Sequence, residues 1–144
     1  MRVDFYQLSE TAVEAALPAL AAKMREAGAK VLVVSADEAQ RARISEALWA
    51  PTGTFLAHGL AGGPDDARQP ILLSDRLEAP NEARFLALAD GQWREGAEAF
   101  EWVFLLFDNS TIDDARATWR SLDGRADTVR NYWRQEGKGW VQAA

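Results

Sequence analysis

The sequence contains no cysteine and a single histidine, His58, among its 144 residues. Without cysteine the chain forms no disulfide bond, no thiolate zinc site and no cysteine nucleophile. One histidine is also too few for the histidine-rich ligand sets of catalytic zinc sites. We therefore expect no bound metal, no cofactor and no catalytic residue in this chain.

Long apolar runs and a basic N-terminal segment are missing as well. No apolar run approaches the length of a membrane span, and the N-terminal MRVDFYQL lacks the pattern of a secretory signal. The net charge of −6 opposes a general grip on DNA, because neutralising phosphates needs clustered lysine and arginine. These absences favour a cytoplasmic protein that binds neither a membrane nor a specific DNA sequence.

The positive charge that the chain does have is concentrated in residues 115–138. This window holds six positive and three negative side chains, a net charge of +3, so the remaining residues carry −9. Trp119, Tyr132 and Trp133 lie within the same window. A basic, aromatic region on an acidic chain indicates a local anionic partner, and direct nucleic-acid binding through this C-terminal third is one possibility.

Alternating strand and helix signals run along the chain. Short apolar runs predict strands over 3–8, 30–35, 71–74, 84–90, 101–108 and 127–133, the last at the sheet edge and followed by a tail, 134–144. Periodic apolar residues predict helices over about 12–28, after Ser35 to about Trp49, and 109–124. The order implies one domain, 1–144, with a three-layer α/β/α architecture and a largely parallel sheet.

Two helix starts carry the spacing of a capping box. Thr11 with Glu14 precedes the first helix, and Ser35 with Glu38 precedes the second. Pro18 lies inside the first helical pattern, where proline removes a backbone hydrogen bond. We therefore expect a kink or a late helix start at Pro18.

The usual nucleotide-binding motifs are absent. The turn after the first predicted strand, QLSETAVE, has no glycine, and no Walker A sequence occurs. The glycines near His58 are followed by Pro64, Asp65 and Asp66, whose charges repel phosphate. A small α/β enzyme or nucleotide-binding protein that uses His58 and this glycine loop is the alternative, although a structural or partner-contacting histidine is favoured.

Two surfaces are better candidates than a catalytic site. Trp49, at a predicted helix end, and Phe55 are apolar residues that either seal the core or dock a helix or peptide of another protein. On the helix over 109–124, an apolar, basic and aromatic stripe recurs at i, i+4, i+7 and i+8: Ile112, Arg116, Trp119 and Arg120. This stripe is either a solvated arginine face or a shallow pocket that binds carboxylates beside an apolar floor.

Several segments together resemble a known family. They are FYQL at 5–8, ALWAPTGTFLAHG at 47–59, PILL at 70–73, VFLLFD at 103–108, ARATWR at 115–120 and YWRQ at 132–135. In order and spacing the chain resembles the chi subunit family of bacterial DNA polymerase III, nearly from end to end. The resemblance implies a single Rossmann-like α/β domain without a nucleotide-binding motif.

The resemblance also implies a role in DNA replication. Members of the family are non-catalytic adaptors within the polymerase holoenzyme that link the clamp loader, through its psi subunit, to the acidic C-terminal tail of single-stranded DNA-binding protein. By their motif positions, Trp49 and Phe55 are then expected to face psi. The residues expected at the tail are Leu105, Ile112, Arg116, Trp119, Arg120 and Arg130.

Overall fold

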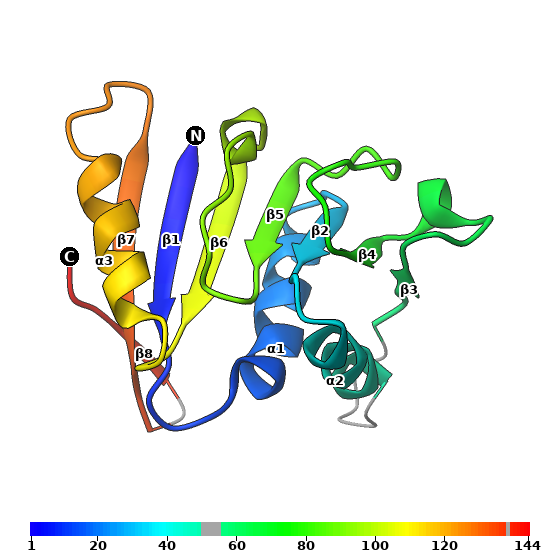
Figure 1. Cartoon of the computed structure of the whole chain (residues 1–144), viewed down its shortest axis with the longest axis horizontal. Helices are drawn as coiled ribbons and strands as arrows, with labels where there is room; N and C mark the ends of the chain where they lie inside the picture. Colours follow the sequence, from blue (N-terminus) through cyan, green and yellow to red (C-terminus); the bar gives the residue numbers. More distant parts are fainter. Residues whose placement is uncertain (50–55, 138) are drawn as a thin grey trace.

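The computed structural model describes residues 1–49, 56–137 and 139–144. Within these residues, eight strands form one sheet in the order β3-β4-β2-β5-β6-β1-β7-β8 (Figure 1). The strands are β1 (Arg2–Gln7), β2 (Val31–Val34), β3 (Gly59–Leu60), β4 (Ile71–Ser74), β5 (Phe85–Leu88), β6 (Trp102–Phe107), β7 (Val129–Glu136) and β8 (Gly139–Gln142). Neighbouring strands run parallel except β7 and β8. The expectation of an α/β fold with a largely parallel sheet is confirmed.

The end of the chain differs from the predicted edge strand and tail. β7 pairs with β1 on one side and with β8 on the other, so β7 is not at the sheet edge. Trp140 of β8 packs edge-on against Tyr6 of β1, with the ring centres 4.9 Å apart. This contact attaches the predicted tail to the sheet, and no local pattern in the tail reveals it. The two-residue strand β3 was also not predicted.

The helices are α1 (Val13–Glu26), α2 (Glu38–Trp49) and α3 (Ile112–Ser121), with 3-10 turns η1 (Asp66–Arg68) and η2 (Ala97–Ala99). Pro18 lies within α1, so a late start at Pro18 is wrong. The first capping box is also wrong, because both side chains bind distant partners. The hydroxyl of Thr11 accepts a hydrogen bond from Gln135, and the carboxylate of Glu14 accepts one from Arg43.

The second capping box is replaced by an aspartate one residue before the helix. A carboxylate oxygen of Asp37 accepts a hydrogen bond from the backbone amide of Ala39, at 2.9 Å. The Ser35 hydroxyl donates to the side chain of Gln40 instead of bonding to the first turn in the way that was expected. Asp37 therefore caps α2, as aspartate commonly does at this position.

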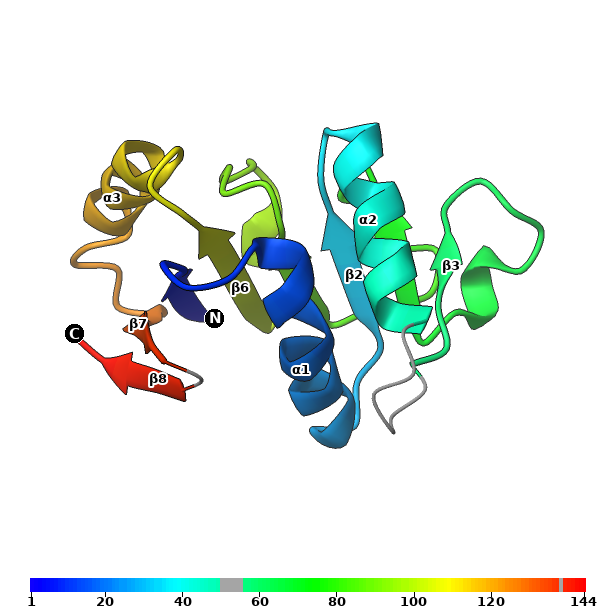
Figure 2. The same ribbon diagram turned by 90° about the horizontal axis from the view of Figure 1, so that it is seen from below.

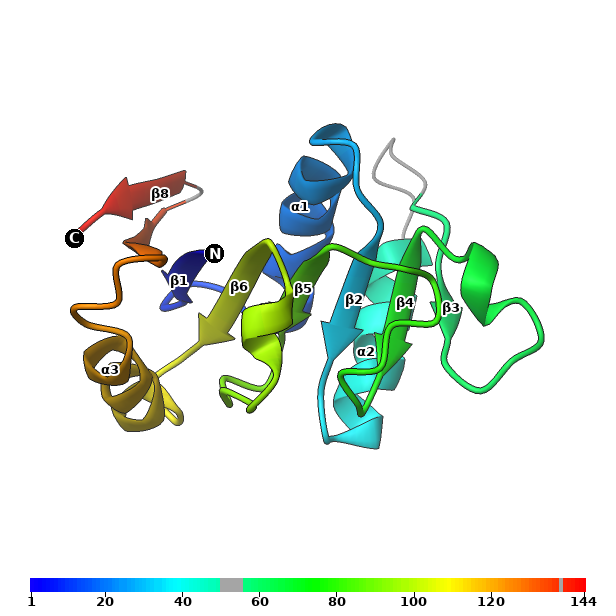
Figure 3. The same cartoon turned by 90° about the horizontal axis from the view of Figure 1, so that it is seen from above.

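The sheet separates two apolar cores, because side chains alternate between the faces of a strand. α1 and α2, which pack against each other (Figure 2), cover one face, where Tyr6, Phe104 and Leu106 of the strands are buried. α3 covers the other face, where Phe5 and Leu105 are buried. Figure 3 shows α1 and α3 on opposite sides of the strands. The placement of α3 over β1, β6 and β7 builds the surface described next.

Candidate functional site

The outer side of α3 carries the stripe that the sequence indicated. Arg116 and Arg120 are exposed, whereas Ile112 and Trp119 are half-buried and pack against the core beneath α3. Ala115 and Thr118 are buried and turn the other side of the helix to the sheet. The helix therefore presents two arginines to solvent next to a partly covered indole.

Trp119 is fixed in place by aromatic rings from the sheet. Its ring meets Phe5 edge-on at 5.1 Å between centres and Tyr132 edge-on at 5.7 Å. Phe5 and Tyr132 themselves lie parallel, 6.4 Å apart. Edge-on contacts of this kind hold a ring in one orientation, so one face of the indole is set before any ligand arrives.

Arg130, on β7, secures the same tryptophan. Its guanidinium lies 4.0 Å from the centre of the Trp119 ring. One nitrogen donates to the Trp119 carbonyl at 2.6 Å, and the other donates to the carboxylate of Asp123 at 2.9 Å. The Arg130 side chain is only 20% exposed, and its guanidinium is used in contacts within the protein, between β7 and α3.

Leu105 does not reach the surface. It lies on β6 with 0% exposure and belongs to the core under α3. Leu105 therefore supports the stripe from below, and the expected direct contact with a ligand is not possible in this arrangement. The sequence pattern marks Leu105 as apolar but not as buried beneath a helix.

Arginines on α3 and β7 supply the positive charge of this surface. Within the residues that the structure describes, Arg116 and Arg120 form no ion pair and no side-chain hydrogen bond. Burial raises the pKa of Tyr132, and the positive charges of Arg116 on α3 and Arg134 on β7 oppose that rise. The Tyr132 hydroxyl donates to the side chain of Gln7. Exposed guanidiniums beside aromatic rings suit carboxylates attached to apolar groups.

A second exposed aromatic residue ends α2. Trp49 is 52% exposed, and its ring centre lies 4.7 Å from that of His58. Trp49 therefore does not seal the core. Leu60, on β3, is also largely exposed. Phe55, the other predicted residue of this surface, lies outside the described residues.

His58 occupies a structural position rather than an open one. It is buried, its Nδ1 donates to the carbonyl of Leu56 at 2.9 Å, and its Nε2 accepts from the Ser45 hydroxyl at 2.8 Å. A carbonyl oxygen only accepts, which fixes the proton on Nδ1. Both ring nitrogens are occupied, so the geometry opposes a general base and fits an anchor that ties the loop to α2.

The glycine loop also lacks free amides for a phosphate. The backbone amides of Gly62 and Gly63 donate to the two carboxylate oxygens of Asp66, at 2.9 and 3.1 Å. An internal carboxylate thus occupies the donors that a phosphate would need. This arrangement disfavours the nucleotide-binding alternative.

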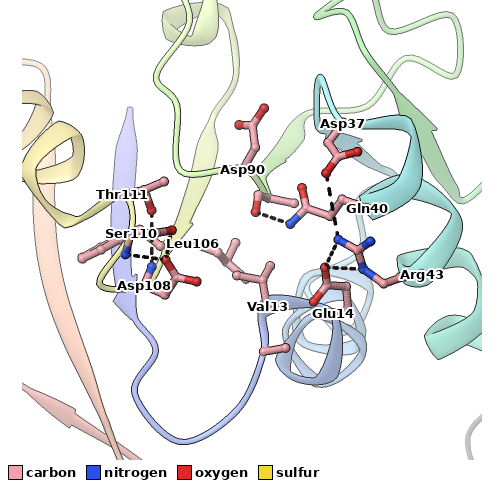
Figure 4. A pocket seen from close by; sticks show the side chains of 13 residues that line it. Val13, Glu14, Asp37, Gln40, Arg43, Asp90, Leu106, Asp108, Ser110 and Thr111 are labelled. Carbon is pink, nitrogen blue, oxygen red and sulfur yellow. Dashed lines mark hydrogen bonds and ion pairs between the residues drawn. The ribbon is translucent and has the colours of Figure 1, made fainter.

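A crevice of about 270 Å³ lies where parallel α/β sheets usually bind ligands, at the carboxyl ends of β5 and β6 (Figure 4). Its charged lining residues are four acids, Glu14, Asp37, Asp90 and Asp108, and one base, Arg43, which already pairs with Glu14 at 3.1 Å. Burial alone would raise the pKa of Asp90, but the hydrogen bonds and charge of Arg94 and nearby backbone amides lower it. The crevice therefore carries negative charge and does not suit a phosphate.

Metal and membrane sites find no support in the described part of the chain. Its histidine, aspartate and glutamate side chains form no group of three that could hold a metal ion. No helix there has both the length and the apolar character needed to cross a membrane.

Comparison with known proteins identifies the family. The model of the family described as DNA polymerase III chi subunit, HolC, matches residues 1–129. The chain belongs to the DNA polymerase III chi subunit family. It is 45% identical over 115 residues to DNA polymerase III subunit chi of Escherichia coli (strain K12), which covers 77% of this chain and 78% of that protein. The resemblance inferred from the sequence is confirmed, and with it a link to DNA replication.

The family match includes α3 but ends where β7 begins. Tyr132 and Arg134 of β7 lie beyond it, and sequence reasoning did not select either as a site residue. Strand alternation gave a usable signal, because Arg130, Tyr132 and Arg134 are spaced by two and so share one face. That this face is the one beneath α3 follows only from the pairing of Phe5 with Tyr132 and Gln7 with Arg134.

Proposed function

We propose that this chi-family chain is a non-catalytic adaptor of the DNA polymerase III holoenzyme. In this proposal α3 binds the acidic C-terminal tail of single-stranded DNA-binding protein, and the end of α2 binds the psi subunit of the clamp loader. The role places the chain in the cytoplasm, where the bacterial chromosome is copied. The helices on both faces of the sheet also favour the three-layer, Rossmann-like class.

The observation that carries the tail-binding proposal is the pair of exposed arginines beside a half-buried tryptophan that packs on two aromatic rings. Arg116 and Arg120 form no ion pair within the described residues, on a chain whose net charge is −6. Their guanidiniums offer charge-assisted hydrogen bonds to carboxylates, while the exposed part of Trp119 offers an apolar contact. An acidic segment with an apolar terminal residue matches both features.

The psi-binding proposal rests on Trp49. Large aromatic side chains that are half-exposed are enriched at protein interfaces, and Trp49 is 52% exposed. In Figure 1, α2 and α3 lie toward different ends of the sheet. Both partners therefore have room to bind at once, and several tails on one coated DNA strand would raise the effective concentration of the tail.

Fluorescence anisotropy with an acidic peptide ending in proline-phenylalanine tests tail binding. We expect saturable, salt-sensitive binding by the wild type and binding about tenfold weaker for Arg116→Ala, because charge-assisted hydrogen bonds are lost. Arg76→Ala is the matched control, since Arg76 is exposed and its ion-pair partner, Asp75, is its neighbour in the chain. Lack of binding by the wild type, or equal binding by Arg116→Ala, would refute the proposal.

Binding to purified psi subunit tests the other surface. Trp49→Ala should weaken psi binding and leave peptide binding unchanged, because the two surfaces lie on different helices. Loss of peptide binding by the same variant would indicate a single shared surface instead. Saturable nucleotide binding, or steeply salt-dependent binding to single-stranded DNA alone, would favour the alternatives.

A further inference from the structure

Two arginines of β7 lie on the face beneath α3, and their surroundings differ. The guanidinium of Arg130 packs on the Trp119 ring and donates hydrogen bonds to Trp119 and Asp123, and the side chain is 20% exposed. Arg134 is 50% exposed, and its partner is Glu136, 3.3 Å away and itself 57% exposed. A solvent-exposed pair of this kind contributes little free energy, so a ligand carboxylate can replace Glu136 at low cost.

Arg134 and Arg116 come from two elements that both adjoin Tyr132. Arg134 shares its strand face with Tyr132, whose ring is in edge-on contact with Trp119. The charges of Arg116 and Arg134 both act on the Tyr132 hydroxyl and oppose the pKa rise that burial causes there. One guanidinium comes from α3 and the other from β7, so cations from two separate elements act on Tyr132.

We propose that Arg134, and not Arg130, is the arginine of β7 that binds the acidic tail, together with Arg116 across Tyr132. Arg130 is then a positioning residue that holds Trp119. This inference rests on the proposed tail binding, and it adds a carboxylate contact that lies beyond the region of the family match, which ends at residue 129.

Strand geometry predicts which carboxylate Arg134 meets. Arg134 is four residues beyond Arg130, which is about 13 Å along a strand. If the apolar end of the tail packs on Trp119, beside Arg130, an extended peptide covers that distance with about four residues. Arg134 therefore recognises an acidic residue about four positions before the terminal apolar residue. Acids nearer the end are left to Arg116 and Arg120.

Two fluorescent peptides of equal length, both ending in proline-phenylalanine, separate the contacts. One peptide is acidic throughout, and the other has amides in place of the acids four or more positions from the end. For Arg134→Ala we expect about three- to tenfold weaker binding of the first peptide and unchanged binding of the second. Arg76→Ala should change neither, and Arg116→Ala should weaken both.

Glu136→Gln provides an independent variant that leaves Arg134 intact. Removing the competing carboxylate should tighten binding of the fully acidic peptide about twofold, and this gain should vanish when Arg134→Ala is added. Unchanged binding of the acidic peptide by Arg134→Ala, with loss for Arg116→Ala, would overturn the inference while tail binding stands. Absence of binding of either peptide by the wild type would overturn both.

The positioning role of Arg130 has its own readout. Arg130→Lys and Arg130→Ala should change the near-ultraviolet circular dichroism of Trp119 and weaken both peptides equally. Arg134→Ala should leave that spectrum unchanged. A loss confined to the fully acidic peptide, with an unchanged spectrum for Arg130→Ala, would return the ligand contact to Arg130 and refute the division of roles.

Discussion

Replacing Trp119 by alanine removes the ring that joins α3 to the aromatic residues of the sheet. The indole makes edge-on contacts with Phe5 and Tyr132, and the guanidinium of Arg130 lies 4.0 Å from its centre. Each aromatic contact contributes about 0.5–1.5 kcal/mol and a partly exposed cation–π contact about 0.5–1 kcal/mol. The free energy of unfolding should therefore fall by about 1.5–4 kcal/mol, before any relaxation of α3.

Trp119→Phe separates packing from ligand binding. A phenyl ring retains an apolar surface for edge-on contacts, so we expect a loss of only about 1 kcal/mol. The two variants should also differ in binding. The affinity of Trp119→Ala for the acidic peptide should fall more than tenfold, because the variant lacks the apolar indole and the position of Arg130 changes. The affinity of Trp119→Phe for the same peptide should fall less than fivefold.

Urea unfolding followed by far-ultraviolet circular dichroism measures the first effect, and anisotropy with the acidic peptide measures the second. Binding is compared below the unfolding transition, where both variants are folded. A loss of less than 1 kcal/mol for Trp119→Ala would show that the aromatic contacts do not fix α3. Equal peptide affinity for the alanine variant and the wild type would refute the assignment of Trp119 to the binding surface.

Three further substitutions test the fold and the second surface. Asp4→Ala should lower the unfolding free energy by about 2–4 kcal/mol, since the buried carboxylate accepts hydrogen bonds from two indole nitrogens, and urea unfolding measures this. His58→Ala should cost about 1–3 kcal/mol and weaken psi binding through Trp49, whose ring it contacts, with calorimetric titration as the check. Burial alone would raise the pKa of Asp90, but the hydrogen bonds and charge of Arg94 lower it overall. The Asp90 carboxylate therefore stabilises the fold fully above its unfolded pKa of about 4. This stabilisation is lost as the pH falls through the lowered pKa of the folded state. Asp90→Asn should therefore flatten the acid limb of a plot of unfolding free energy against pH, and an unchanged limb would contradict this.

The predicted strands from 30–35, 71–74 and 101–108 agree with the structure because their signal is local. Strands buried on both faces need continuous apolar residues, and VLVV, ILLS and WVFLLF supply them. The capping boxes failed because they assume that a side chain bonds to its own helix. Thr11 binds Gln135 from β7 instead, and that contact has no trace in the sequence around Thr11.

The candidate site shows the same division. Spacing on one helix was enough to bring Arg116, Trp119 and Arg120 to one side of α3, because helical periodicity depends only on chain position. Spacing could not separate Arg130 from Arg134, since both have the same charge and the same strand face. Their difference in exposure depends on Trp119 and Asp123, which come from α3 and the turn after it.

By itself the sequence determined the alternating α/β architecture, the acidic chain with one basic, aromatic region, and the family. Each of these follows from local patterning or from ordered motifs along the chain. Only the tertiary structure decided that Leu105 is buried, that His58 and the glycine amides are already bonded, and that arginines from two elements act on Tyr132. Those properties depend on which strands are neighbours, and parallel pairing joins residues more than 120 positions apart, such as Phe5 and Tyr132.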